Sequence, residues 1–156
     1  MITIAIPSLI PMSIHDLILD FNGTLAIDGK VIPGVRERII TLAADVNIHV
    51  VTGNSFGTAE EELKGLPCKV VLLAPDNQAK EKLDYLQCLN TLSTISIGNG
   101  RNDKLLLKSS VISIVVVQAE GASVEAIKYA HVVCTSIISA LDMIISPARL
   151  VATLRS

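Results

Sequence analysis

Three apolar segments of this chain each run into a short turn of polar residues and glycines. Leu17-Ile18-Leu19 leads to Asp20 and the turn at Asn22-Gly23, Val50-Val51 leads to Thr52-Gly53-Asn54, and Thr94-Ile95-Ser96-Ile97 leads to Gly98-Asn99-Gly100-Arg101-Asn102-Asp103. Open α/β sheets bind their ligands beyond the carboxyl ends of the strands. If the three segments are parallel strands, their polar ends meet, and we expect them to form one site.

The residue types in these turns suit phosphoryl transfer through an enzyme carboxylate. Asp20 is the candidate nucleophile, because a carboxylate can attack phosphorus and the rest of the catalysis is positioning and charge neutralisation. Asp20 and Asp103 offer hard oxygen ligands to Mg²⁺, helped by a backbone carbonyl at Asn22. Thr52 and the backbone N–H groups after it can donate hydrogen bonds to a phosphoryl oxygen. The pattern therefore predicts a magnesium-dependent site for a small phosphorylated substrate.

The composition favours a parallel sheet covered by helices on both faces. Half of the 156 residues are apolar and only 3% are aromatic, which suits strands that are buried on both sides. Runs of β-branched residues alternate with helical patterns, and this indicates right-handed βαβ crossovers. The expected strands are residues 2–6, 16–20, 49–51, 69–72, 94–97, 112–117 and 131–133. The first two are expected to pair as an N-terminal hairpin, and residues 1–156 to form one α/β domain.

Prolines and capping residues mark the starts of the expected helices. Pro33 is expected at the first position of a helix that runs to Ala44, and Asp76 is expected to cap a helix over 78–89. A further helix is expected after Asn102. Residues 137–154 form a last amphipathic segment with a break at Pro147, because proline lacks the N–H that would continue a helix.

Charge and cysteine content exclude several classes of function. Thirteen Lys and Arg against fifteen Asp and Glu give a formal charge of -2, and without a basic cluster nucleic acid is not expected as a partner. Cys68, Cys88 and Cys134 lack the paired spacing of zinc and redox motifs, and we expect reduced, buried thiols. The longest apolar stretch, 111–117, is far shorter than the ~20 residues of a membrane span. We therefore expect a cytoplasmic protein that does not bind a membrane.

The three turns also resemble a known family. The segments from Asp20 to Leu25, from Val50 to Gly53 and from Gly98 to Asp103 resemble motifs I, II and IV of the haloacid dehalogenase-like phosphohydrolase superfamily. Together with Pro75 and Lys82, the third segment is most similar to the phosphorylation domain of P-type ATPases and to soluble P-type ATPases. The resemblance implies a Rossmann-like three-layer sandwich, Mg²⁺ as cofactor and a phosphoaspartate intermediate.

The resemblance assigns roles to individual residues. Asp20 becomes the nucleophile, and the phosphoryl group is held by Thr52, Gly53 and Asn54. A lysine supplies the cation of motif III, and Lys82 is chosen because Leu86 and Leu89 follow it at the spacing of an apolar helix face. Lys80 remains the alternative. The metal ligands are expected to be Asp20, Asn22, Asn99 and Asp103, with Asp103 acting directly or through water.

Two positions depart from the family pattern. The usual general acid/base is an aspartate two residues after the nucleophile, where this chain has Asn22. Without it the rate falls by about 10²–10⁴, so we expect slow hydrolysis that favours leaving groups needing no proton, such as those of ATP or acyl phosphates. Asn99 stands where the family usually has a metal-binding aspartate, and the lost negative charge predicts weaker Mg²⁺ affinity.

The spacing of the motifs leaves no room for a cap domain. About thirty residues separate Asp20 from Thr52, and Thr52 from Lys82, which is enough for one crossover each. Specificity must then come from a partner, from a homo-oligomer neighbour, or from residues 25–32 acting as a flap. Two other hypotheses remain: a degenerate family member that senses phosphate or binds a partner without turnover, and a response-regulator-like fold, which lacks a turn like 98–103.

Overall fold

A six-stranded parallel sheet forms the centre of the molecule, which a computed structural model describes over residues 1–7 and 9–156. In spatial order its strands are β10 (Val132–Cys134), β9 (Ile112–Val116), β8 (Thr94–Gly98), β3 (Asp16–Leu19), β6 (Asn47–Thr52) and β7 (Lys69–Leu72). Every neighbouring pair of strands is parallel. The predicted α/β class with a mainly parallel central sheet is confirmed.

The order of the strands reverses at β3. This strand pairs with β6, the next strand of the sheet in sequence, on one side and with β8 on the other. Such a reversal leaves a crevice at the carboxyl ends of the central strands, where open α/β sheets bind ligands. Asp20 directly follows β3 and therefore lies at the point that the topology favours for a site.

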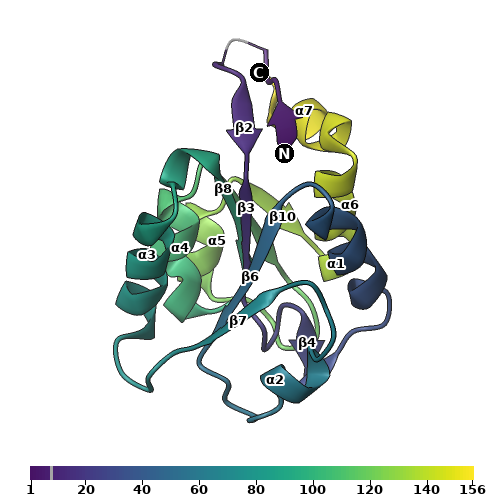
Figure 1. The fold of residues 1–156 in the computed structure, drawn as a ribbon. Helices are drawn as coiled ribbons and strands as arrows, with labels where there is room; N and C mark the ends of the chain where they lie inside the picture. Colours follow the sequence, from purple (N-terminus) through teal and green to yellow (C-terminus); the bar gives the residue numbers. More distant parts are fainter. Residues whose placement is uncertain (8) are drawn as a thin grey trace.

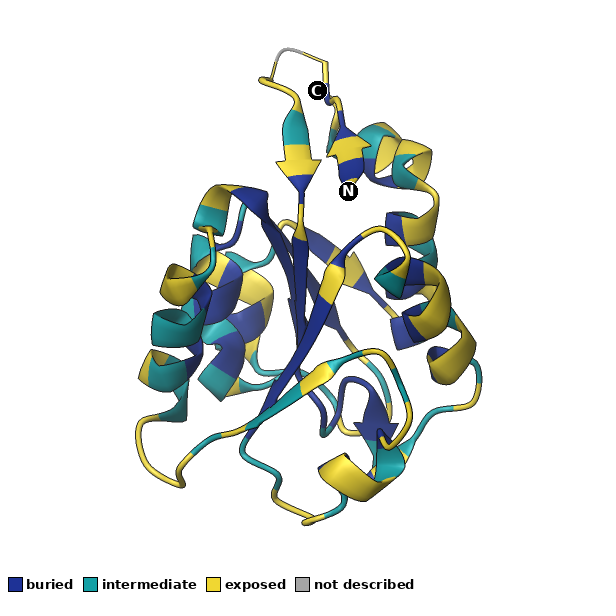
Figure 2. Ribbon diagram, in the orientation of Figure 1, coloured by how far each residue is buried: buried dark blue, intermediate teal, exposed yellow. Residues whose placement is uncertain are grey.

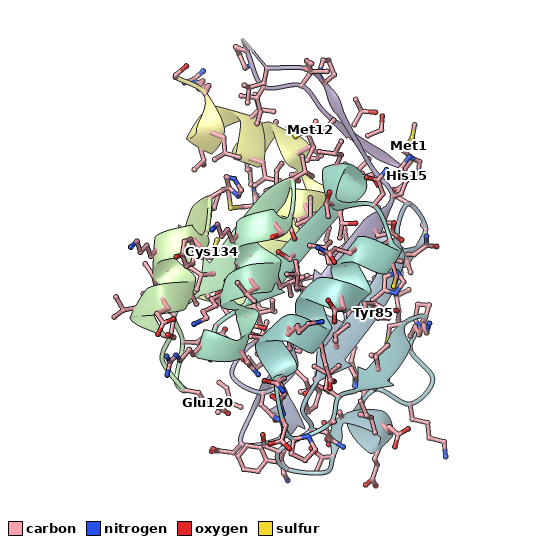
Figure 3. The ribbon with its side chains drawn as sticks, turned by 90° about the vertical axis from the view of Figure 1, so that its left-hand side faces the viewer. Met1, Met12, His15, Tyr85, Glu120 and Cys134 are labelled. Carbon is pink, nitrogen blue, oxygen red and sulfur yellow. The ribbon has the colours of Figure 1, made fainter. Side chains whose placement is uncertain are left out.

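Helices cover both faces of the sheet (Figure 1). On one face lie α1 (Val35–Ala43) and α6 (Ile137–Ile145). On the other face lie α3 (Gln78–Cys88), α4 (Lys104–Ser109) and α5 (Val124–Tyr129), which are side by side in the turned view of Figure 3. These two helical layers and the sheet form the predicted three-layer sandwich.

The central strands are buried between the two helical layers (Figure 2). All four residues of β3 are buried, and their side chains alternate between the faces as strand geometry requires. Leu17 and Leu19 belong to the larger core, which also contains Leu141 of α6. Ile18 belongs to a second core with Leu86 of α3. The strand that carries Asp20 is thus fixed from both sides.

No domain is inserted into the two crossovers that follow the nucleophile segment, all of whose residues the structure describes. Between β3 and β6 lie only α1 and a short antiparallel hairpin of β4 (Ala26–Ile27) and β5 (Lys30–Val31). Between β6 and β7 lies only the short helix α2 (Ala59–Glu62). This part of the chain is capless, as its spacing predicts.

The N-terminal hairpin has a different second strand from the predicted one. β1 (Ile2–Ile4) pairs antiparallel with β2 (Met12–Ile14), and Ile2 lies opposite Ile14. The prediction that residues 16–20 pair with the first strand is wrong. Those residues form β3, and both of its edges are already taken by β6 and β8, so that no edge is left for β1.

Two of the predicted helix starts are also corrected. Helix α1 begins at Val35 after Gly34, whose φ of 90° is left-handed, so Pro33 lies outside the helix. Helix α3 is preceded by Asn77 in a left-handed conformation, and no side chain caps it, so Asp76 is not its cap. The predicted break at Pro147 is confirmed, because α7 (Pro147–Leu154) begins there.

The last two helices form a bent pair. Within the described part of the chain no single helix combines the length and the apolar composition of a membrane span; α6 and α7 do so only when taken together, and their axes are bent by 101°. Four residues of α6 are buried: Ile137, Ala140, Leu141 and Ile144. The cysteines are free, as expected, but only Cys134 is buried, because Cys68 is half-buried and Cys88, the last residue of α3, is exposed.

Candidate active site

The polar ends of the three central strands converge, as the sequence predicts. Asp20 follows β3, Thr52 ends β6 and Gly98 ends β8, and these strands are neighbours in the sheet. Beyond their ends lies a cavity of about 140 Å³. Its lining residues are Asp20, Asn22, Thr52, Gly53, Ser55, Gln78, Asn99, Gly100 and Asn102. The cavity is large enough for a phosphoryl group, and apart from two glycines its lining residues have polar side chains.

A buried lysine joins the two carboxylates of the site. Lys82 Nζ lies 2.6 Å from Asp20 Oδ1 and 2.6 Å from Asp103 Oδ1. The Lys82 side chain has no exposed surface, whereas the Lys80 side chain is 70% exposed and pairs with Asp84 on the outside of α3. Of the two candidate lysines, the structure therefore brings Lys82 to Asp20 and leaves Lys80 in solvent.

Burial and charge set the protonation of this cluster. Burial raises the pKa of Asp20, the charge of Asp103 raises it further and Lys82 opposes both, so that the pKa comes to about 6. Burial lowers the pKa of Lys82, but the charges of Asp103 and Asp20 outweigh this effect and the net shift is upward. Lys82 is thus a fixed cation, and Asp20 is mostly ionised at neutral pH.

Asp103 faces into the protein rather than into the cavity. Its Oδ1 accepts the hydrogen bond from Lys82, and its Oδ2 accepts from the backbone N–H groups of Asn99, at 3.0 Å, and Gly100, at 2.8 Å. Its side chain is fully buried. A Cβ at Gly98 would lie 2.4 Å from Asp103 Cγ, so only glycine fits there. Asp103 therefore holds both Lys82 and the turn that presents Asn99.

Asn99 and Thr24 connect the third turn to the first turn, which carries Asp20. Asn99 Nδ2 donates to the carbonyl of Gly121 at 3.0 Å, and its Oδ1 accepts from Thr24 Oγ1 at 3.1 Å. Thr24 Oγ1 also lies 3.3 Å from Asp20 Oδ2. Gly23 has a φ of 77°, and a Cβ there would lie 2.2 Å from Asn99 Nδ2. The close approach of the first and third turns thus depends on this glycine.

The second turn contributes Thr52 but not the side chain of Asn54. Thr52 is buried, and its Oγ1 accepts from the backbone N–H of Asn54 at 2.9 Å. Asn54 Oδ1 instead accepts from the N–H of Ala59 at the start of α2, and Asn54 is absent from the cavity lining. The prediction that Asn54 faces the phosphate site is corrected, because its side chain accepts from the first N–H of α2 and its own N–H donates to Thr52.

The predicted flap does not cover the cavity. None of residues 25–32, all of them described, lines it. The β4–β5 hairpin is instead fixed by two glutamates that do not line the cavity. The backbone N–H of Asp28 donates to Glu120 at 2.8 Å, and the backbone N–H of Val31 donates to Glu62 at 2.9 Å. Figure 3 shows Glu120 at the end of the molecule opposite Met12.

Known structures share the fold of this chain. A haloacid dehalogenase-like family protein from Streptococcus pneumoniae aligns with a TM-score of 0.63 at 12% identity, over 83% of this chain and 97% of that one. The cobalt-bound deoxy-D-mannose-octulosonate 8-phosphate phosphatase YrbI of Haemophilus influenzae aligns with a TM-score of 0.67 at 19% identity, over 88% and 90% of the two chains. This chain has the haloacid dehalogenase-like fold.

Further similarities concern another solved enzyme and two archaeal sequences. The corresponding phosphatase of Moraxella catarrhalis, crystallised with magnesium, phosphate and its sugar, has the same fold at a TM-score of 0.66 and 15% identity, over 91% of this chain and 94% of that one. The chain is 37% identical over 87 residues to the uncharacterized protein MJ0073 of Methanocaldococcus jannaschii. This alignment covers 51% of this chain and 94% of MJ0073, so the two proteins belong to one family. No protein-family model matches the chain.

The haloacid dehalogenase-like fold raises the question of whether these residues suit a divalent cation. Asn22 Oδ1 is buried and has no hydrogen-bond partner among the described residues. It belongs to a residue that lines the same cavity as the oxygens of Asp20 and Asn99. Carboxylate and amide oxygens are the hard ligands that Mg²⁺ prefers, so the donor set fits. The negative charge of this donor set is low, since the described residues contain no cluster of three or more His, Cys, Asp or Glu side chains that could hold a metal ion.

One residue that fixes the nucleophile turn was missed by the sequence analysis. Gln118 Nε2 donates to the carbonyls of Gly23, at 3.1 Å, and Thr24, at 2.8 Å. Its Oε1 accepts from the N–H of Ile137 at 2.7 Å, at the start of α6. Gln118 follows β9 closely, so the rule that singled out the other strand ends could have found it.

Proposed function

We propose that residues 1–156 form one haloacid dehalogenase-like domain that hydrolyses a small phosphorylated substrate through a phosphoaspartate at Asp20. The observation that carries this proposal is the position of the Asp20 carboxylate. It lies at the switch point of the sheet, lines a polar cavity of about 140 Å³ and accepts a 2.6 Å hydrogen bond from a buried lysine. A structural carboxylate would gain nothing from facing such a cavity.

In the proposed reaction Asp20 attacks the phosphorus of the substrate. A bond forms between a carboxylate oxygen and phosphorus, the bond to the leaving oxygen breaks, and the leaving group takes the electron pair. Water then attacks the phosphorus, and the bond to the carboxylate oxygen breaks with its electron pair returning to Asp20. Phosphate is released, and the protons of the water go to phosphate and solvent. Lys82, whose pKa is raised by the two carboxylates against the effect of burial, keeps its proton throughout and acts as a charge.

Thr52 is suited to bind the phosphoryl group. Its Oγ1 already accepts a hydrogen bond from the backbone N–H of Asn54, so the hydroxyl proton remains to be donated to a phosphoryl oxygen. The backbone of Gly53, which also lines the cavity, adds a donor beside it. Together with Lys82 these groups stabilise negative charge where it develops.

Magnesium would be held by Asp20, Asn22 and Asn99, whose oxygens surround the cavity. Asp103 is the fourth predicted ligand, but its two oxygens already accept three hydrogen bonds. We therefore assign it to the positioning of Lys82 and of the Asn99 turn, with contact to a cation through water. A bound cation would neutralise part of the charge on the phosphoryl oxygens.

The side chain at position 22 restricts the leaving group. An amide cannot transfer a proton, so an alkoxide would have to leave unprotonated. Substrates whose leaving group is stable without a proton, such as ATP and acyl phosphates, are therefore favoured. This preference agrees with the similarity of residues 98–103 to P-type ATPases.

The test is a phosphate-release assay on purified protein with Mg²⁺ and a panel of acetyl phosphate, ATP and sugar phosphates. We expect slow hydrolysis of the first two, its loss in Asp20→Asn, and unchanged rates in the control Asp84→Asn, whose side chain is 49% exposed on α3. Unchanged turnover in Asp20→Asn would reject the proposal.

A second candidate function is phosphate binding without turnover. The two amides at Asn22 and Asn99 favour it, because both stand where the family's pattern has carboxylates. A degenerate protein of this kind would bind phosphate or an acyl-phosphate mimic such as beryllium fluoride, yet release no phosphate from any member of the panel.

A further inference from the structure

A second hollow adjoins the candidate catalytic cavity. Gln78 and Asn102 line both the 140 Å³ cavity and a groove of about 660 Å³. The other residues that line the groove are Pro75, Asn77, Ala79, Arg101 and Lys104. The two hollows therefore meet at Gln78 and Asn102. A substrate whose phosphoryl group occupies the cavity can extend past these two residues into the groove.

The boundary between the two hollows is a fixed pair of amides. Asn102 Nδ2 donates to Gln78 Oε1 at 2.9 Å, which joins the first residue of α3 to the turn after β8. A Cβ at Gly53 would lie 2.3 Å from Gln78 Nε2. Glycine at this position is thus what allows the Gln78 amide to approach the Thr52 turn, within reach of the cavity.

Two cationic side chains line the groove, whereas none lines the cavity beside it. Arg101 and Lys104 line the groove, and both pair with the single carboxylate of Glu125, at 2.8 Å and 2.6 Å. One positive charge therefore remains, and no acidic residue lines the groove. Asp76, in the same loop as Pro75, is exposed but is not a lining residue. Behind the cavity, by contrast, the buried cation Lys82 faces two carboxylates.

We propose that this groove binds the further phosphates of a phosphoanhydride, so that the substrate class is a polyphosphate chain rather than a sugar monophosphate. This inference rests on the proposed function. Attack of Asp20 on the terminal phosphorus breaks its bond to the bridging oxygen, and the remaining phosphate chain leaves with the electron pair and without taking a proton. Such a leaving group suits an asparagine at position 22.

The test measures binding, so that it does not depend on turnover. Orthophosphate, inorganic tripolyphosphate and ATP are titrated by calorimetry, at one excess concentration of Mg²⁺, into the unaltered protein and into Arg101→Ala/Lys104→Ala. The matched control is Lys80→Ala, which removes an exposed cation of α3 that lies outside the groove. Thermal unfolding of each variant checks that it is folded.

We expect the double substitution to lower the affinity for tripolyphosphate and for ATP by about tenfold, because each exposed ion pair contributes only modestly to binding. The affinity for orthophosphate should fall by less than about twofold. The effect should shrink at high salt. Equal affinities of ATP and tripolyphosphate identify the phosphate chain as the recognised part. The proposal is overturned if the double variant keeps its affinity for tripolyphosphate, if ATP binding ignores the substitution, or if orthophosphate weakens as strongly.

The outcome separates this inference from the proposed function. A protein with the expected binding pattern but no phosphate release keeps the groove assignment and rejects the phosphohydrolase. A protein that hydrolyses the panel but binds tripolyphosphate independently of Arg101 and Lys104 keeps the phosphohydrolase and rejects the groove assignment. Where turnover is seen, the double substitution should raise KM for ATP more than KM for acetyl phosphate, because acetyl phosphate has no further phosphates to place in the groove.

Discussion

Lys82 Nζ lies 2.6 Å from Asp20 Oδ1, at the tip of a side chain with no exposed surface. The same ammonium lies 2.6 Å from Asp103 Oδ1, so one charge on α3 ties the end of β3 to the turn after β8. Removal of a partner from a buried ion pair leaves an uncompensated charge. This cluster is therefore where substitutions should have their largest effects on stability.

Lys82→Met should destabilise the protein by about 3–5 kcal/mol, because it leaves two buried carboxylates without their counter-ion. Lys80→Met, which removes a lysine that is 70% exposed, should change the free energy of unfolding by less than about 0.5 kcal/mol. Urea unfolding near neutral pH measures both. Similar effects of the two substitutions would contradict the placement of Lys82 in the site.

The pH dependence of stability should depend on Asp20. Its pKa is raised from 3.8 to about 6 in the folded protein, so the native state binds the proton more tightly than the unfolded state. The contribution of Asp20 to the stability of the wild type therefore falls as pH rises from about 4 to about 6, by up to about 3 kcal/mol. Asp20→Asn cannot titrate, so its stability relative to wild type should rise over that window.

Denaturant unfolding without metal at several pH values measures this difference. Asp142→Asn is the control of opposite sign, because the hydrogen bond from Arg38 lowers the pKa of Asp142. The stability that this pair contributes to the wild type appears as pH rises and is lost in acid. An Asp20→Asn variant whose stability parallels that of wild type across the window would show that Asp20 titrates normally.

Asn22→Asp should restore proton transfer to the leaving group. General acid catalysis contributes about 10²–10⁴ in rate, and only substrates with poor leaving groups need it. Hydrolysis of a sugar phosphate should therefore rise by about 10² or more, while that of acetyl phosphate changes much less. An equal rise for both substrates would mean that Asn22 affects a step other than departure of the leaving group.

Asn99→Asp should strengthen Mg²⁺ binding, because it adds a negative charge to a hard-cation site. Without metal the variant should be less stable than wild type, since a carboxylate would face the Gly121 carbonyl that now accepts from Asn99 Nδ2. A ligand that binds the folded state raises the melting temperature. Mg²⁺ should thus raise the melting temperature of Asn99→Asp more than the melting temperature of the wild type. The control is Asn90→Asp, since Asn90 lies directly before η1 (Thr91–Ser93), and Mg²⁺ should raise its melting temperature less as well.

The strand ends could be predicted because each combines a local apolar pattern with a turn that needs glycine or a short polar residue. Lys82 could be chosen over Lys80 because the apolar positions after it have helical spacing, and Leu86 is indeed buried behind it. These signals lie within a few residues of one another. Local periodicity therefore sufficed for the sheet, for the positions of Asp20 and Thr52 at its strand ends, and for the choice of the lysine that contacts Asp20.

The sequence predictions failed where a contact between residues far apart in the sequence decides the pairing of a strand or the position of a side chain. The partner of β1 depends on β3 having both edges occupied. The side chain of Asn54 turns to the start of α2 rather than to the cavity. Gln118 contacts the nucleophile turn from nearly a hundred positions away in sequence. None of these contacts leaves a periodic signal in the chain.

Acid-quench labelling tests the central claim most directly. The protein is mixed with Mg²⁺ and ATP radiolabelled on its terminal phosphate, quenched in acid and digested, and the label is mapped. We predict an acid-stable, hydroxylamine-sensitive phosphoryl group on Asp20 that is absent from Asp20→Asn. Phosphate released from ATP by the wild type with no label on Asp20, or with label that persists in Asp20→Asn, would contradict this account.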